Sequence, residues 1–158
     1  MVRFEEVDAC DLLDWLTIYN TKPLSTREIK VHDDTLFSEY RAEVMEVLRI
    51  DEDEDDVAPV RVIWNLLDLT RLPYEHFYPQ IRLMCELKSV IWTRLLDSCI
   101  LVRNNAGLVS FLRMLFSVYT PQRPVIVVAV KGDVNKMLKG EVTQMRDKSV
   151  GNLESIWF

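Results

Sequence analysis

The second half of the sequence alternates apolar runs with helical repeats, and this order restricts the fold more than any other feature. The apolar runs lie at 60–69, 98–103 and 124–130, and they have the composition of strands covered on both faces. Between them, apolar residues recur every three or four positions, which is the spacing of a helix face. We therefore expect helices over 74–96 and 104–118. Strands that alternate with helices favour parallel pairing through right-handed crossovers.

The remaining segments predict further elements. A last helix is expected after Asp133, which is placed to cap it. In the first half, residues 11–20 end in β-favouring Trp, Thr, Ile and Tyr and form a candidate first strand, while 27–32 alternate like an edge strand. The turn residues at 20–23 would join these two into a hairpin. A helix is expected from Asp33–Asp34–Thr35 to about Arg49.

These elements predict an α/β fold: a single mixed, mainly parallel β-sheet of four to five strands, flanked by helices. A chain of 158 residues fits one domain with a buried core. We place this domain at residues 1–148 and a C-terminal tail at 149–158, which is polar until its last three residues. The core residues expected in neighbouring central strands are Val62, Ile63, Leu66, Val127 and Val128.

Three segments resemble the STAS-like fold of the anti-sigma-factor antagonist superfamily. The family's central strand, which typically ends in Asp-Leu and a small polar residue, is similar to VIWNLLDLTRLP. Its second strand, a helix and a third strand introduced by Arg-Pro are similar to LLDSCILVRNNAGLVSFLRMLFSVYTPQRPVIVVAV, and the short helix that closes the domain is similar to VKGDVNKMLKG. The likeness spans roughly Asp11 to Gly140 and implies a non-catalytic domain that acts through protein contacts.

The resemblance does not carry over the regulation of that family. In its regulated members, a serine beside an aspartate at the next helix start is phosphorylated by a partner kinase. That position falls at 74–79, where no Asp-Ser-Ser-Gly occurs, and the nearest hydroxyl is Thr70 at the strand end. A second, weaker likeness, over 60–130, is to lipid-exchange domains of the Sec14 type, which normally need a longer chain to enclose a lipid.

Composition excludes several classes of partner. The formal net charge is −6, and the six acids of Asp51–Asp56 contribute all of it, so the remainder of the chain sums to zero. No basic cluster occurs, and we expect neither nucleic acid nor an anionic membrane as a partner. The acidic run lacks the central glycine and the twelfth-position glutamate of an EF-hand, so we expect a solvated loop without metal.

The cysteines and the hydropathy pattern favour a cytoplasmic protein. The three cysteines are an odd number without CxxC spacing, and Cys85 and Cys99 lie in apolar surroundings typical of the core. A reducing compartment is the simplest setting for them. The N-terminus has acids where a signal peptide is apolar, and no run approaches the ~20 apolar residues of a membrane span.

The chain has no recognisable catalytic motif. Asp68, Glu75 and His76 are the best group for acid–base chemistry, but Glu75 and His76 are adjacent at a helix start, where we expect their side chains to point apart. His32 and His76 lie far apart in the sequence, and neither HExxH nor GxSxG is present. We therefore expect no enzymatic activity, no cofactor and no metal site.

An aromatic helix start is the candidate contact surface. Phe77 continues an apolar series into the helix and is expected in the core, which leaves Tyr74 and Tyr78 on a shared outer face. Tyrosine and arginine are enriched at protein interfaces, and the last two aromatics of the tail need a surface to cover them. The expected interface residues are Arg71, Tyr74, Tyr78, Arg82, Trp157 and Phe158, and the partner is a protein of unknown identity, with a homodimer as one form of that contact.

Two functions remain open after the sequence is read. The first is a STAS-like protein-interaction or regulatory domain, and the alternative is a small-molecule or lipid binder with a pocket between the sheet and a helix. A binder should show a large enclosed apolar cavity, and an enzyme a cleft with converging polar groups. An interaction module should instead show an exposed apolar patch.

Overall fold

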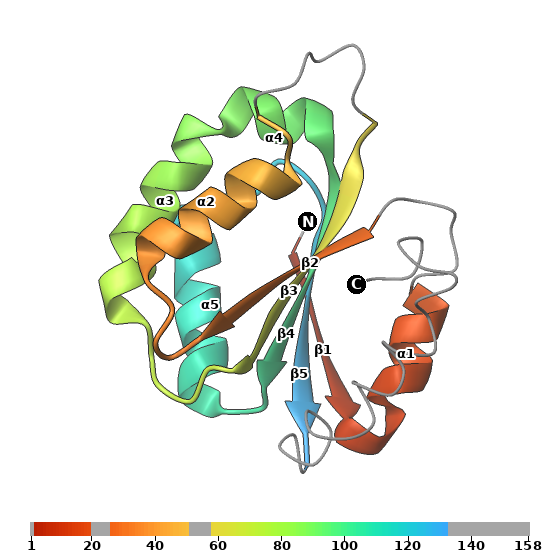
Figure 1. Cartoon of the computed structure of the whole chain (residues 1–158). Helices are drawn as coiled ribbons and strands as arrows, with labels where there is room; N and C mark the ends of the chain where they lie inside the picture. Colours follow the sequence, from red (N-terminus) through yellow and green to blue (C-terminus); the bar gives the residue numbers. More distant parts are fainter. Residues whose placement is uncertain (1, 20–25, 51–57, 133–158) are drawn as a thin grey trace.

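The computed structural model describes residues 2–19, 26–50 and 58–132, which form a layered α/β domain (Figure 1). The described residues contain one sheet of five strands, in the order β1-β5-β4-β3-β2, and every neighbouring pair is parallel. The strands are β1 (Val2–Asp8), β2 (Thr26–His32), β3 (Val60–Asp68), β4 (Leu95–Arg103) and β5 (Val125–Lys131). The prediction of an α/β fold with a mainly parallel sheet and flanking helices is confirmed.

Helices cover both faces of the sheet. They are α1 (Leu12–Tyr19), α2 (Phe37–Val47), α3 (Phe77–Glu86), α4 (Lys88–Arg94) and α5 (Ala106–Val118), with short 3-10 turns η1 (Ala9–Asp11) and η3 (Tyr74–His76). The chain steps from β2 to β5 through neighbouring strands, and right-handed crossovers put α2, α3, α4 and α5 on one face. The step from β1 to β2 runs across the sheet in the opposite direction, which puts α1 on the other face (Figure 1).

The first half of the chain differs from the sequence prediction. Residues 12–19 form α1 and not a strand, because Leu12 and Leu16 lie one helical turn apart and are both buried against the sheet. Burial of this pair outweighs the β preference of the residues that follow it. Consequently the expected hairpin does not form, although β2 is an edge strand as predicted. The first strand is instead β1, whose sequence VRFEEVD contains too many charged residues to be recognised as an apolar strand.

The second half follows the prediction closely, with two differences. The helix expected over 74–96 is divided at Leu87 into α3 and α4, and β4 begins at Leu95. Asn105 caps α5 as expected, since its side-chain oxygen accepts hydrogen bonds from the main-chain NH groups of Gly107 (2.8 Å) and Leu108 (3.2 Å). The expected core residues Val62, Ile63, Val127 and Val128 are fully buried and Leu66 is half-buried, but β4 separates their strands.

Other expectations have mixed outcomes. Cys99 is buried in β4, whereas Cys85 is exposed because it lies on the outer side of α3. The acidic run 51–56, the helix expected after Asp133 and the tail 149–158 lie outside the described residues. No helix in the described part of the chain has the length and apolar character needed to cross a bilayer.

A buried ion pair fastens α1 to the sheet. Arg61 of β3 donates to both carboxylate oxygens of Asp97 in β4, from Nε (2.7 Å) and from an amino group (3.0 Å), and also to the main-chain oxygen of Tyr19 in α1 (2.7 Å). The guanidinium lies 4.3 Å from the centre of the Tyr19 ring. Burial raises the pKa of the Tyr19 phenol, which donates to Asp97 (3.3 Å). We call these three residues the Arg61 network.

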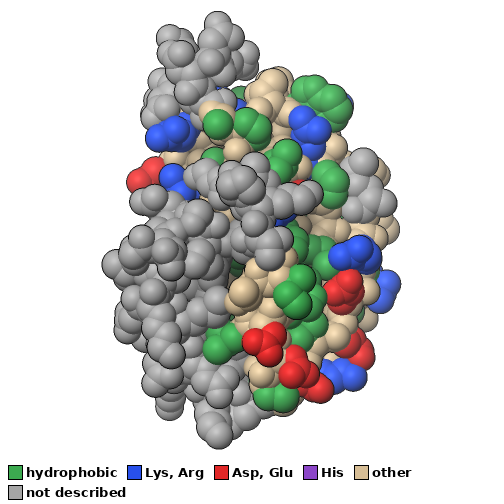
Figure 2. Space-filling model, turned by 90° about the vertical axis from the view of Figure 1, so that its right-hand side faces the viewer, with side chains coloured by type: hydrophobic (Ala, Val, Ile, Leu, Met, Phe, Trp, Pro, Cys, Tyr) green, Lys and Arg blue, Asp and Glu red, His purple; other side chains and the backbone are tan. Residues whose placement is uncertain are grey.

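The outer surface on the α1 side is chemically mixed. Figure 2 shows this face, on which acidic and basic side chains of the described residues are interspersed with hydrophobic ones. Trp15 of α1 donates a hydrogen bond through its indole NH to Glu5 of β1 (3.1 Å). A polar contact therefore joins α1 to β1 on this side of the sheet. The described residues that are visible in this view therefore show no extended patch of one charge.

Candidate functional site

A cavity lies between the sheet and the helices of the opposite face. Its volume is about 160 Å³, and it is partly open to solvent, so it is not the large enclosed cavity that a binder was expected to show. The sheet side of the wall comes mainly from β3 and β4, with Val31 of β2 and Val125 of β5, and the helix side comes mainly from α3 and α5. The central lining residues are Trp64, Leu66, Ile100, Phe77, Ile81, Met84, Phe111 and Leu115.

Strand alternation explains why these residues face the cavity. In β3, Ile63 and Leu67 point to α1 and are fully buried, while Trp64 and Leu66 point to the helices of the other face. Trp64 and Leu66 are only half-buried although β3 is an inner strand. A half-buried residue on a covered strand borders on unfilled space, and here that space is the cavity.

Polar groups lie at the two ends of the cavity. At the carboxyl ends of β2 and β3 they are Thr35, His76 and Gln80, and near the amino ends of β4 and β5 they are Ser98, Tyr119, Gln122 and Arg123. Arg123 is the only arginine or lysine among the described lining residues, and none of these is an aspartate or glutamate. The cavity is thus an apolar space with one cation at its amino end.

Two polar atoms at the amino end have no partner. Gln122 Oε1 and Arg123 Nε are buried and form no hydrogen bond with any residue that the structure describes. The Arg123 guanidinium lies 4.3 Å from the centre of the Trp92 ring and donates through an amino group to the Trp92 main-chain oxygen. Because buried polar atoms are nearly always paired in native proteins, these two atoms distinguish this end of the cavity.

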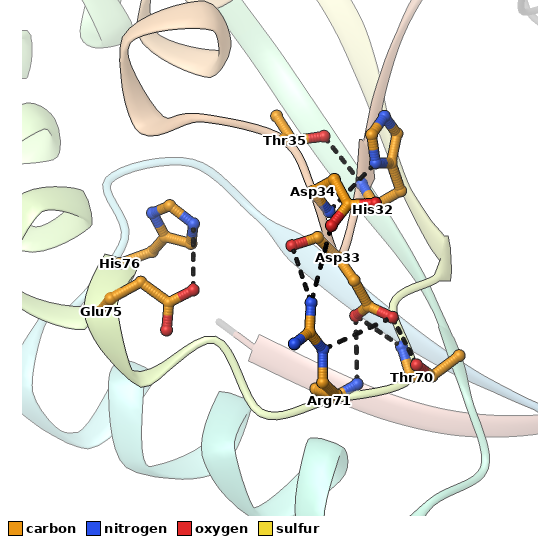
Figure 3. Close-up of polar contacts among 8 residues, drawn as sticks. All are labelled: His32, Asp33, Asp34, Thr35, Thr70, Arg71, Glu75 and His76. Atoms are coloured by element: carbon orange, nitrogen blue, oxygen red, sulfur yellow. Dashed lines mark hydrogen bonds and ion pairs between the residues drawn. The ribbon is translucent and has the colours of Figure 1, made fainter.

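A group of polar contacts lies where β2 and β3 end, on the side of the sheet's carboxyl ends (Figure 3). The Asp33 carboxylate accepts hydrogen bonds from the main-chain NH groups of Thr70 (3.0 Å) and Arg71 (3.1 Å) and from the Thr70 hydroxyl. These hydrogen bonds, the one from the Thr70 hydroxyl above all, lower the pKa of Asp33. We call this the Asp33 clamp, and it joins the loop after β2 to the loop after β3.

The group expected to suit acid–base chemistry is only partly assembled. His76 Nε2 lies 3.6 Å from Glu75 Oε1, so the expectation that these side chains point apart is wrong (Figure 3). The two residues belong to the end of a 3-10 turn and not to a regular helix. Asp68 is exposed at the end of β3 and makes no hydrogen bond or ion pair with either of them. The His76 ring instead stacks on Phe37 at 5.7 Å.

The aromatic helix start has the orientation that its spacing predicts. Phe77 is buried, whereas Tyr74 and Tyr78 are 63% and 69% exposed. The Arg71 side chain is 70% exposed and Arg82 is exposed. The structure therefore presents these four side chains on the surface, and their role as an interface stays a prediction. Trp157 and Phe158 lie outside the described residues.

Sequence reasoning missed the amino end of the cavity. Gln122 and Arg123 lie between Pro121 and Pro124, a segment whose prolines indicate only the end of a helix and the start of a strand. The available signal was a cation with no acidic neighbour in the sequence, directly before the most apolar strand. Its contact with Trp92, which lies far away in the sequence, becomes visible only in the fold.

Comparison with known proteins adds no family. No protein-family model matches the sequence, and a comparison with curated proteins found no match. Within residues 2–19, 26–50 and 58–132, no three histidine, cysteine, aspartate or glutamate side chains come together as a metal site. A functional hypothesis must therefore start from the cavity and from the exposed tyrosines.

Proposed function

We propose that this domain binds a small, predominantly apolar molecule in the cavity between the sheet and helices α3 and α5. The cavity itself is the observation that carries this proposal. Protein interiors are packed as densely as organic crystals and hold few voids larger than a water molecule. A cavity of about 160 Å³ in a domain of this size is therefore a feature that needs an explanation.

The size and lining of the cavity suit a ligand of about one ring. An apolar cavity of about 150 Å³ in another protein stays free of water and binds benzene. Here the wall offers the aromatic faces of Trp64, Phe77 and Phe111 together with aliphatic side chains. Such a wall attracts a ligand through burial of its apolar surface and through close contacts, not through many hydrogen bonds.

The test is to titrate the full chain with toluene and to follow thermal unfolding and tryptophan fluorescence. Binding to the folded state alone raises stability by about 2.7 kcal/mol at a ligand concentration of 100 Kd. Trp64 lines the cavity and should report occupancy directly. We expect toluene to raise the Tm and to change the fluorescence until it saturates.

A matched pair of variants locates the toluene site. Leu66→Phe adds a ring at the cavity wall and should abolish the effect of toluene. Leu36→Phe adds the same ring at a position that is 62% exposed, and it should leave toluene binding unchanged. The proposal fails when toluene does not bind the unaltered chain, or when the Leu66→Phe variant folds and binds it equally well.

We propose a second function, a STAS-like contact with a protein partner, because the tyrosine face is exposed. We define this face by Arg71, Tyr74, Tyr78 and Arg82. Aromatic residues beside arginine are the composition of binding hot spots. The resemblance to the STAS-like fold supports this proposal, since the strand–helix–strand order of its main segments is present in β3, β4, α5 and β5.

The tyrosine face is tested by affinity capture from the native source with mass spectrometry, and by sedimentation equilibrium for a homodimer. Tyr74→Ala and Tyr78→Ala should each weaken the contact. Ile18→Ala removes a hydrophobic side chain that is 72% exposed on α1, across the sheet from this face, and should have no effect. A partner that binds all three variants equally well would place the interface elsewhere.

A further inference from the structure

We infer that the ligand of the cavity is a small monocarboxylic acid, with its carboxylate at Arg123 and Gln122 and its apolar part among the aromatic side chains. This inference rests on the proposed binding function and adds the chemical class and the orientation of the ligand. It follows from three features of the cavity: the one arginine among its described lining residues, two buried polar atoms without partners, and its volume.

The first feature is the charge at the amino end. Arg123 has no ion pair with a carboxylate among the residues that the structure describes. It is held in place from one side, by the Trp92 ring and the Trp92 main-chain oxygen. The described lining residues include no carboxylate that would repel an anionic ligand. An anion is therefore the ligand charge that this end favours.

The second feature is the pair of unpartnered atoms. Arg123 Nε carries a hydrogen without an acceptor, and the guanidinium fork of Nε and an amino group matches the two oxygens of a carboxylate. A half-turn of the Gln122 amide places its NH₂ group where the unpartnered Oε1 now lies. Both residues then donate to one carboxylate, so Arg123 Nε gains an acceptor and the Gln122 NH₂ group replaces the unpartnered oxygen on that side.

The local backbone is suited to holding this arrangement. Gln122 and Arg123 are flanked by Pro121 and Pro124, whose rings fix their own φ angles and restrict the residues before them. A segment that is already restricted loses less conformational freedom when a ligand binds. The carboxyl end of the cavity offers no comparable site, because His76 there faces the Glu75 carboxylate at 3.6 Å.

The third feature is the volume, which limits the apolar part. A cavity of about 160 Å³ accepts one six-membered ring or a short aliphatic chain. The part of a ligand that lies inside this space is therefore much smaller than a long-chain fatty acid or a phospholipid. The class of ligand is thus an aryl or short aliphatic monocarboxylate, of which phenylacetate is a practical probe.

The experiment compares three probes of one ring each on the full chain at pH 7: phenylacetate, toluene and benzylamine. Affinities are measured by tryptophan fluorescence and by the rise in Tm. Hydrogen bonds to a charged group predict that phenylacetate binds at least about tenfold more tightly than toluene. Benzylamine should bind more weakly than toluene, because its ammonium group meets the Arg123 cation.

Variants at two arginines then locate the head group. Arg123→Gln should reduce the affinity for phenylacetate to the level of toluene and leave the affinity for toluene unchanged. The matched control is Arg113→Gln, because Arg113 also lies over an aromatic ring, that of Phe4 at 4.0 Å, but does not line the cavity. This control should keep the preference for phenylacetate.

The outcomes separate this inference from the function on which it rests. Binding of toluene without a preference for phenylacetate overturns the carboxylate assignment and leaves the binding function intact. A preference that survives in Arg123→Gln also overturns it. Failure of all three probes to bind contradicts the binding function itself. If Arg123→Gln does not fold, the comparison of the three probes on the unaltered chain still tests whether the cavity prefers a carboxylate.

Discussion

Among the described elements, one face of the sheet is covered by α1 alone, and the other by α2, α3, α4 and α5 (Figure 1). The α1 face buries a complete polar network, in which Arg61 is bonded to Asp97 and to α1. The opposite face contains the cavity and, at its end, an arginine with an unpartnered nitrogen. One side of the sheet thus holds a buried, hydrogen-bonded arginine, and the other side has unfilled space.

The two faces show two different roles of buried side chains: some stabilise the fold, and others line a space that a ligand can fill. Close packing stabilises a fold and a buried charge needs its partner, whereas a cavity lowers stability because its lining lacks contacts. A chain that keeps such a cavity gives up stability on that side, and a ligand that fills it restores the missing contacts. The comparison predicts that equivalent substitutions on the two faces have different effects.

The largest effect is expected from Asp97→Ala on the α1 face. It leaves the Arg61 guanidinium, whose side chain is 5% exposed, without its carboxylate. Removing one partner of a buried ion pair typically costs about 3–5 kcal/mol. Chemical denaturation at neutral pH measures the free energy of unfolding of the variant and of the unaltered chain.

Two controls define what the loss of Asp97 means. Glu86→Ala breaks the exposed pair with Arg41, at 2.7 Å, and should cost at most about 1 kcal/mol. The double change Arg61→Met with Asp97→Leu should recover most of the stability, because it leaves no buried charge. A loss below about 1 kcal/mol in Asp97→Ala would show that α1 is held by apolar packing alone.

The next effect compares two neighbouring leucines of β3. Leu67 points to α1 and is 1% exposed, while Leu66 lines the cavity and is half-buried. Leu67→Ala should cost about 3 kcal/mol, and Leu66→Ala at least about 1 kcal/mol less, since its surroundings already contain unfilled space. Equal losses in denaturant unfolding would mean that the two faces are packed equally well.

The sequence was sufficient for the part of the fold where local and tertiary preferences agree. The apolar runs of β3, β4 and β5 read as buried strands because both of their faces are covered. The charged sequence of β1 does not, since it lies at the edge of the sheet and pairs only with β5. Residues 12–19 favour a strand by composition, and only their packing on the finished sheet makes them a helix.

The candidate site was less accessible to sequence reasoning. Apolar residues at helical spacing indicate a buried face, but the same spacing describes a filled core and a core with a cavity. Whether Trp64 meets another side chain or empty space depends on residues from several elements that are far apart in the sequence. The orientation of Tyr74, Phe77 and Tyr78 was predictable, because it depends on one short helix and its spacing alone.

A smaller effect is expected at the Asp33 clamp, and it depends on pH. The clamp lowers the pKa of Asp33 in the folded state, so its contribution is fully present above about pH 4 and is lost as the pH falls through the lowered value. Asp33→Asn should cost about 1 kcal/mol at pH 7. The difference between variant and unaltered chain should shrink in denaturant unfolding at about pH 3.

The control for the clamp is Asp34→Asn, because the Asp34 side chain is 91% exposed. It should change stability little at either pH. A cost for Asp33→Asn that stays constant between neutral and acid pH would show that the hydrogen-bond geometry of the clamp, and not the charge of Asp33, joins the two loops.

The smallest effect on stability is expected at Tyr74 and Tyr78, on the outer side of the layer that covers the cavity. Tyr74 touches Phe111 edge-on at 5.9 Å, and Tyr78 touches Phe77 at 5.2 Å. Both tyrosines are mainly exposed, so each change to alanine should cost no more than about 0.5 kcal/mol and shift the Tm by a few degrees at most. Phe77 and Phe111 both line the cavity, so a larger loss would show that the tyrosines support its wall. In that case their alanine variants should also bind toluene more weakly, and the tyrosine face would belong to the ligand site and not to a separate protein interface.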